Sequence, residues 1–239
     1  MLVGEDFQKI EWNFQSWELL EPNAFIGDTL LCMLALFFAF KIRKMRSEGT
    51  FYNYWYWFFI LFGVSLFVGG LAHLFWNYWG IRGKYFSWYT GIVAVFYIEQ
   101  AMISLYPKKR IRLGLINWSI LKLLLAIIGL TVMLNKVDVA ADLSKGLLIP
   151  SINSAVGMIL SLVVLTMHYQ RKKQGDFKMF WLGVFVLLPA AFFQFMKINL
   201  APWFDRNDMS HVLLAGMFIC YFLAIAKFRE SRLKLTYSR

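Results

Sequence analysis

Charged residues are scarce in this sequence. Only 16% of its 239 residues are Asp, Glu, Lys or Arg, whereas 59% are hydrophobic and 19% are aromatic. A soluble domain of this length needs a far more polar surface, because water surrounds it on every side. The composition therefore excludes an ordinary soluble globular protein and favours an integral membrane protein.

Cysteine is also rare. Cys32 and Cys220 each stand alone inside an apolar stretch, so the sequence contains no pair with the spacing of a metal or redox motif. Isolated cysteines in apolar surroundings usually pack as small hydrophobic side chains. The cysteines thus favour no chemistry of their own.

Acidic residues are outnumbered by basic ones, 14 to 25, and the formal net charge is +11. Such an excess is also found in nucleic-acid-binding proteins. Here the basic residues flank apolar stretches, which is how the orientation of membrane helices is marked. We therefore expect no nucleic-acid partner, and expect membrane lipids as partners, with a second membrane protein as a further candidate.

Seven apolar stretches follow one another with short connections. Each is close to the roughly 20 residues that a helix needs to cross a bilayer. They cover residues 24–40, 54–77, 86–106, 113–134, 147–168, 177–200 and 208–227. The sequence predicts an all-α fold, an integral membrane bundle of seven transmembrane helices over residues 24–228, with a basic tail at residues 229–239.

Lys and Arg are distributed unevenly between the two ends of this bundle. They are frequent after the first, third and fifth stretches and in the C-terminal tail, and infrequent in the other connections. Because cytoplasmic loops carry the excess of Lys and Arg, we expect the N-terminus outside and the C-terminus in the cytoplasm. Short loops without outer glycosylation sites favour the inner (plasma) membrane of a cell.

Residues 1–23 combine acidic and aromatic side chains. Phe7, Ile10, Phe14, Trp17 and Leu20 recur three or four residues apart, which places them on one face of a helix. We expect an extracytoplasmic helix lying in the membrane interface. A disordered tail is the alternative.

Four ionisable residues share one predicted depth. Asp28, His73, Asp208 and His211 all fall within about 6 Å of the outer ends of their helices, at about 1.5 Å per residue. Ionisable side chains inside a membrane are costly, and they usually face a bundle interior or a cavity. The sequence predicts an outer-side polar pocket, and separate interfacial hydrogen bonds are the alternative.

Further polar residues lie at two depths. Candidate ligand-binding residues near the same outer layer are Asn77, Asn153, Lys197 and Asn207. Deeper in the membrane, Glu99 and Lys122 lie on consecutive antiparallel helices. Because paired charges tolerate an apolar environment, we expect them to form a structural ion pair.

Two short motifs resemble those of a known superfamily. They are Gly69-Gly70-Leu71-Ala72-His73 and Asn207-Asp208-Met209-Ser210-His211. The helix count, the outer N-terminus and these motifs resemble the seven-helix superfamily of alkaline ceramidases, adiponectin/progestin receptors and Per1-type proteins. In that superfamily histidines hold zinc, and the metal-bound water cleaves a lipid amide.

This resemblance implies roles for individual residues. His73, His211 and Asp208 would bind zinc, and Asp28 and Asp208 would be the catalytic carboxylates. Gly69 stands where the superfamily has Ser, and Asn207 stands where it has a further His, so the chain resembles a reduced-motif, bacterial-type relative. Before the first helix, Glu18, Glu21 and Asn23 resemble the calcium-binding segment of alkaline ceramidases.

Three functions remain open at this point. The first is binding of a lipid, a small ligand or a membrane partner protein at the outer pocket, without catalysis. The alternative is a zinc-dependent intramembrane hydrolase of a lipid amide or ester. A third is haem binding, with His73 and His211 as the axial ligands.

Overall fold

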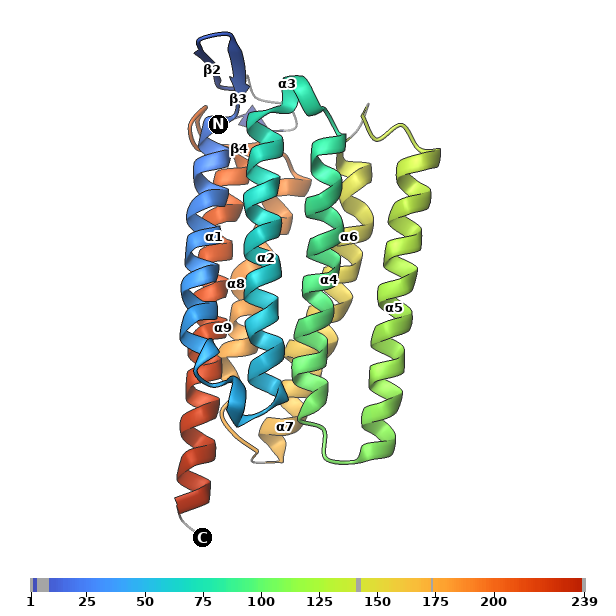
Figure 1. Cartoon of the computed structure of the whole chain (residues 1–239), viewed down its shortest axis with the longest axis vertical. Helices are drawn as coiled ribbons and strands as arrows, with labels where there is room; N and C mark the ends of the chain where they lie inside the picture. Colours follow the sequence, from blue (N-terminus) through green and yellow to red (C-terminus); the bar gives the residue numbers. More distant parts are fainter. Residues whose placement is uncertain (1, 4–8, 141–142, 173, 238–239) are drawn as a thin grey trace.

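The computed structural model describes residues 2–3, 9–140, 143–172 and 174–237. Long helices run side by side in one bundle, with the N-terminus at one end and the C-terminus at the other (Figure 1). The long helices are α1 (Pro22–Arg43), α2 (Thr50–Leu74), α4 (Arg82–Ser104), α5 (Lys109–Lys136), α6 (Leu143–Met158), α8 (Lys178–Phe195) and α9 (Arg206–Tyr237). Shorter elements are η1 (Arg46–Glu48), α3 (Trp76–Trp79), the π-helical η2 (Ile159–Leu165) and α7 (Thr166–Arg171).

Within the described residues, six helical segments are long and apolar enough to cross a membrane, as expected of a multi-pass membrane protein. They are Pro22–Arg43, Thr50–Leu74, Lys109–Lys136, Lys145–Arg171, Lys178–Phe195 and Arg206–Lys234. α4 is a long helix of the same bundle but does not belong to this set. Its sequence includes Lys84, Glu99 and Gln100, all three buried, which lower its hydropathy.

Two of the predicted helices end earlier than expected. α2 stops at Leu74, and Asn77 lies in the separate short helix α3. α8 stops at Phe195, because the chain turns at Lys197, which has a left-handed φ of 48°. Asn199 then pairs with Leu2 in a short ladder between β4 (Ile198–Asn199) and β1 (Leu2–Val3).

The expected interfacial helix at residues 1–23 is wrong over its described part. Residues 11–20 form a β-hairpin of β2 (Glu11–Phe14) and β3 (Trp17–Leu20), and Phe7 lies outside the described residues. Gln15 has a left-handed φ of 53° in the tight turn. Aromatic side chains alternate with polar ones at positions 11–14, which favours a strand and competes with the helical spacing.

Aromatic side chains fill the core between α1, α2, α8 and α9. The ring of Trp55 stacks on Phe180 at 5.2 Å between centroids and lies 5.5 Å from Tyr221. All three side chains are fully buried. This core occupies the part of the bundle nearer the C-terminal end, and the outer polar residues lie beyond it at the end that carries the hairpin (Figure 1).

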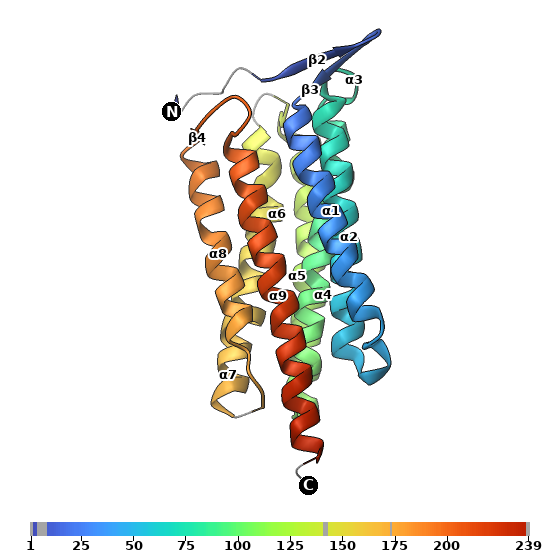
Figure 2. The same cartoon turned by 90° about the vertical axis from the view of Figure 1, so that its left-hand side faces the viewer.

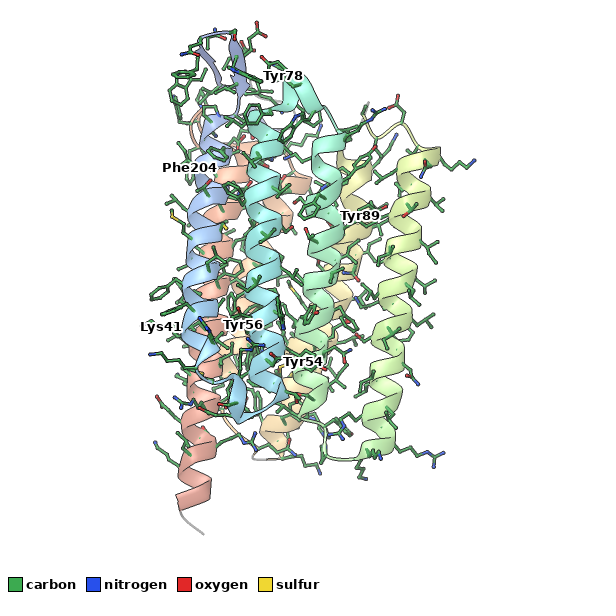
Figure 3. All side chains as sticks on the ribbon, viewed as in Figure 1. Lys41, Tyr54, Tyr56, Tyr78, Tyr89 and Phe204 are labelled. Carbon is green, nitrogen blue, oxygen red and sulfur yellow. The ribbon has the colours of Figure 1, made fainter. Side chains whose placement is uncertain are left out.

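α5 lies at the edge of the bundle and buries few side chains. Its buried residues are Ser119, Ala126 and Leu130. Apolar side chains such as Leu125 and Ile128 are more than half exposed, as expected of a helix that faces lipid. Tyr89 of α4 points toward α5, where its hydroxyl lies 2.7 Å from that of Thr131 (Figure 3).

Candidate functional site

Asp28 occupies the point where three helices approach, at the end of the bundle that carries the hairpin. Its Oδ1 lies 3.2 Å from Nε2 of His211 on α9. On the opposite side it packs against α2 at Gly70, where an added Cβ would lie only 2.8 Å from Cβ of Asp28. Glycine at position 70 leaves room for the Asp28 side chain, and any larger residue there would clash with it.

His211 is held tightly between α9 and α1. A Cβ at Gly27 would lie 2.4 Å from Nδ1 of His211, which means that the imidazole ring lies directly against the α1 backbone. This Nδ1 is buried and, among the described residues, has no hydrogen-bond partner. One ring nitrogen therefore faces Asp28 and the other is covered by Gly27.

His73 pairs with a different carboxylate. Its Nδ1 lies 2.6 Å from Oε2 of Glu21, and Oε1 of Glu21 lies 3.2 Å from Nζ of Lys9. Glu21 precedes α1 with a left-handed φ of 49°, and its N–H donates to the Ile10 carbonyl at 2.8 Å. The hydrogen bond at the base of the hairpin therefore positions Glu21 beside His73.

The electrostatic balance at Glu21 strongly favours its charged form. Burial alone would raise the pKa of this carboxyl, but the hydrogen bond and charge of His73, with the charge of Lys9, outweigh burial and hold the pKa at about 2 instead of 4.5. Glu21 is thus an acceptor that stays ionised in mildly acidic surroundings.

Glu21→Gln should lower the free energy of unfolding at neutral pH by about 1–2 kcal/mol. The pKa difference alone gives about 3 kcal/mol as an upper bound, and the partly exposed Lys9 and the coupled His73 reduce it. Because the folded pKa is the lower one, this stabilisation is present above pH 4.5 and is lost as the pH falls from 4.5 to about 2. Thermal unfolding in detergent micelles across that window should therefore be less pH-dependent in the variant.

The exposed acid Glu11, in β2, provides the matched control. Glu11→Gln should have nearly the same unfolding temperature at neutral pH as the wild type. The change of its unfolding temperature with pH, between pH 4.5 and pH 2, should also be close to that of the wild type. Equal slopes for the wild type and Glu21→Gln would contradict the contribution assigned to Glu21.

Lys84 is a member of this layer that the sequence reading missed. It lies in the first turn of α4, close to a connection between helices, yet it is buried, with 8% of its surface exposed. Its ammonium donates to the Gly69 carbonyl at 3.1 Å, and among the described residues no carboxylate lies within salt-bridge distance. A lysine near a helix end normally extends its ammonium to water. The side chain of Lys84 points into the bundle instead, and this direction marks it as a candidate functional residue.

Asp208 and Asp205 organise the start of α9. Oδ2 of Asp208 accepts from Asn23 Nδ2 at 2.8 Å and from the Asp205 N–H at 3.0 Å. Asp205 Oδ1 in turn accepts from the N–H groups of Asn207 and Asp208, which is a helix N-cap. Burial raises the pKa of Asp205 despite these two hydrogen bonds.

The other predicted ligand-binding residues do not converge on Asp28. Asn207 accepts from Gln194 Nε2 at 3.1 Å. Asn77 donates to the Glu18 carbonyl at 3.4 Å, and Lys197 is exposed in the loop after α8. Asn153 lies deeper than expected, because α6 begins at Leu143, four residues before the predicted boundary.

The deeper polar cluster joins α4, α5 and α6. Nζ of Lys122 lies 3.2 Å from Oε1 of Glu99, as the predicted ion pair requires. Ser119 donates to the other oxygen of Glu99 at 2.5 Å, and Lys122 also donates to the carbonyl and to the side-chain oxygen of Asn153. These four residues, the α5 clamp, attach an otherwise lipid-facing helix to the bundle.

The described residues do not fit the zinc set that the superfamily resemblance implies. Among them, no group of three or more His, Cys, Asp and Glu side chains is placed to hold a metal ion. His73 lies with Glu21, His211 lies with Asp28, and Asp208 lies with Asn23. The backbone of Gly27 also covers Nδ1 of His211.

Comparison with known proteins gives a family but no function. No curated protein matches the chain, and no solved structure matches it. The model of a family described as a family of unknown function, DUF6962, matches residues 24–230, and the chain therefore belongs to that family.

Proposed function

We propose that this protein is a seven-span membrane protein of the inner (plasma) membrane that binds a lipid or small polar ligand at its outer end, without catalysis. The outer layer defined by Asp28, His73, Lys84 and His211 is the proposed site. A partner protein that contacts the same end is the competing form of the binding function.

A seventh crossing is supported by the path of the chain. α4 begins at the end of the bundle where α2 stops, and it ends where α5 begins (Figure 1). Its 23 residues correspond to about 34 Å at about 1.5 Å per residue, enough for a bilayer core of about 30 Å. Its polar residues Lys84 and Glu99 face neighbouring helices, so lipid does not meet them.

The orientation is supported by the positions of basic residues on this path. The connections α1–α2, α4–α5 and α7–α8 lie at the same end as the C-terminus (Figure 1). These connections and the tail carry most of the Lys and Arg residues. An N-terminus outside and a C-terminus in the cytoplasm agree with this distribution.

The observation that carries the binding function is incomplete hydrogen bonding in a buried charged layer. The ammonium of Lys84 has three donors and one described acceptor, the Gly69 carbonyl. Oδ1 of Asn23, in the same outer region, is buried and accepts no hydrogen bond from the part of the chain that the structure describes. Because an unsatisfied buried polar group costs about 1–3 kcal/mol, a bound polar molecule that completes these bonds would be stabilised.

Catalysis is less well supported than binding. His73 pairs with Glu21, and His211 pairs with Asp28. A hydrolase of the expected kind needs two histidines that bind one metal ion together and a further carboxylate that acts as the base, and these two separate pairs do not provide that arrangement. The zinc-dependent hydrolase therefore becomes an outcome of the test, as does haem ligation by His73 and His211.

Thermal unfolding with defined lipids tests the binding function. Purified protein in detergent should gain several degrees in unfolding temperature with at least one of phosphatidylethanolamine, phosphatidylglycerol and cardiolipin. Lys84→Met and Asp28→Asn should lose that gain. Arg82→Met should keep it, because Arg82 lies two residues from Lys84 on α4 and is exposed.

Four results would overturn the proposal. The first is the absence of any lipid-dependent shift in the wild type, and the second is an equal shift in Lys84→Met and Asp28→Asn. The third is stoichiometric zinc that is lost in His73→Ala and His211→Ala, which would favour the hydrolase. A Soret absorption band in purified protein would equally favour haem binding.

A further inference from the structure

The N-terminal hairpin has two chemically different faces. Directly paired residues of an antiparallel ladder point to the same side, and the pairs include Phe14 with Trp17 and Trp12 with Leu19. These four residues form an aromatic face. The opposite face carries polar side chains from Glu11, Asn13 and Glu18, and Leu20, which is buried at the base of the hairpin.

The aromatic face is turned toward the rim of the bundle at Trp17. The ring of Trp17 packs edge-on against Phe75 at 5.7 Å and against Tyr78 at 5.0 Å. The Glu18 N–H donates to the Tyr78 hydroxyl at 3.0 Å. Because Phe75 and Tyr78 belong to the outer rim of the bundle, these contacts fix the direction of the whole face.

About half of the aromatic surface of this face is nevertheless left uncovered by the described residues. Trp12, Phe14 and Trp17 are 58%, 55% and 46% exposed. The hairpin leans away from the helix axes and reaches over α3 (Figure 2). In α3, Tyr78 and Trp79 are also about half exposed, so the aromatic face continues a rim of exposed aromatic side chains.

We propose that the aromatic face of the hairpin lies in the headgroup region of the outer leaflet of the bilayer that holds the bundle. Trp and Tyr favour this region because an apolar ring and a polar N–H or O–H are satisfied there together. The face contains no charged side chain and continues the lipid-exposed surface, which favours lipid over a second protein. Glu11, Asn13 and Glu18 then face water.

This placement gives the hairpin a role at its base. Lys9 precedes β2 and Glu21 follows β3, and the two residues pair with each other at 3.2 Å. Glu21 also contacts His73. Anchoring the hairpin in the leaflet holds Glu21 over the outer end of α2.

Fluorescent labels on opposite faces of the hairpin test this placement. Phe14→Cys and Asn13→Cys are made separately in a Cys32→Ala, Cys220→Ala background and labelled with an environment-sensitive nitrobenzoxadiazole dye. The protein is reconstituted in phosphatidylcholine vesicles that contain nitroxide-labelled lipid. We expect the label at position 14 to emit at shorter wavelength and to be quenched at least twofold more by the nitroxide lipid. The label at position 13 should be quenched several-fold more by aqueous iodide.

Equal iodide quenching at the two positions would overturn the proposal. Shielding of position 14 that persists in detergent without lipid and increases with protein concentration would also overturn it, in favour of a protein partner. Both positions are exposed, and size-exclusion chromatography reports whether each variant is folded. Neither label depends on ligand binding at Lys84, so this test fails or succeeds separately from that of the binding function.

Discussion

Glu99→Gln should lower the free energy of unfolding by about 3–5 kcal/mol, and Lys122→Met should have a similar effect. Each single change leaves a partner whose side chain is no more than 10% exposed without its counter-charge in the α5 clamp, and an unpaired buried charge carries a penalty of that size. The double variant should lose far less than the sum of the two, because no unpaired charge remains. Denaturant unfolding in micelles measures all three values.

An exposed cation on the same helix provides the control. Lys136 lies in the last turn of α5, and Lys136→Met should change stability by no more than about 0.5 kcal/mol. Additive losses in Glu99→Gln and Lys122→Met would refute the coupling. A hydrophobic double variant that is as stable as the wild type would agree with it, since buried ion pairs often contribute little net stability.

Gly27→Ala should cost about 3 kcal/mol or more, although it adds a single methyl group. The new Cβ would lie 2.4 Å from Nδ1 and 3.1 Å from Cε1 of His211, so the ring has to move. Overpacking alone costs about 1–3 kcal/mol, and the displaced ring also leaves Asp28 without its partner. Thermal unfolding in micelles measures the loss.

A glycine in open surroundings gives the matched control. Apart from the adjoining residues and backbone of α5 itself, no heavy atom of the described residues lies within 4 Å of a Cβ at Gly114, so Gly114→Ala should be neutral or stabilising by up to about 1 kcal/mol. Equal stability of Gly27→Ala and Gly114→Ala would contradict the close contact. Combining Gly27→Ala with His211→Ala should cost less than the two changes separately, because the clash disappears.

The helical bundle was largely predictable because apolar length dominates the sequence signal. Within the described residues, six of the expected stretches correspond to helices that are long and apolar enough to cross a membrane. The stretch at residues 86–106 lies in α4, where Lys84 and Gln100 are buried against other helices. A polar residue that faces a neighbouring helix reduces hydropathy without reducing burial, so composition alone does not decide that case.

The layer of the site was predictable, but its pairings were not. Counting residues from the helix ends placed Asp28 and His211 at one depth, and their side chains lie 3.2 Å apart. The partner of His73 is Glu21, which precedes the first helix, and its position depends on a hairpin turn that the three-to-four-residue spacing concealed. The burial of Lys84 could not be predicted, because the position of a residue in the sequence does not determine the direction of its side chain.

α9 spans both ends of the molecule as one continuous helix of 32 residues. His211 lies near its start, and Arg229 lies 18 residues later, about 27 Å along the axis. Arg229 holds Glu48 of the α1–α2 connection through two nitrogen atoms, at 2.6–2.9 Å. One continuous helix therefore joins the His211–Asp28 contact to the Arg229–Glu48 contact at the opposite end of the bundle, so a displacement of α9 along its axis would disturb both contacts.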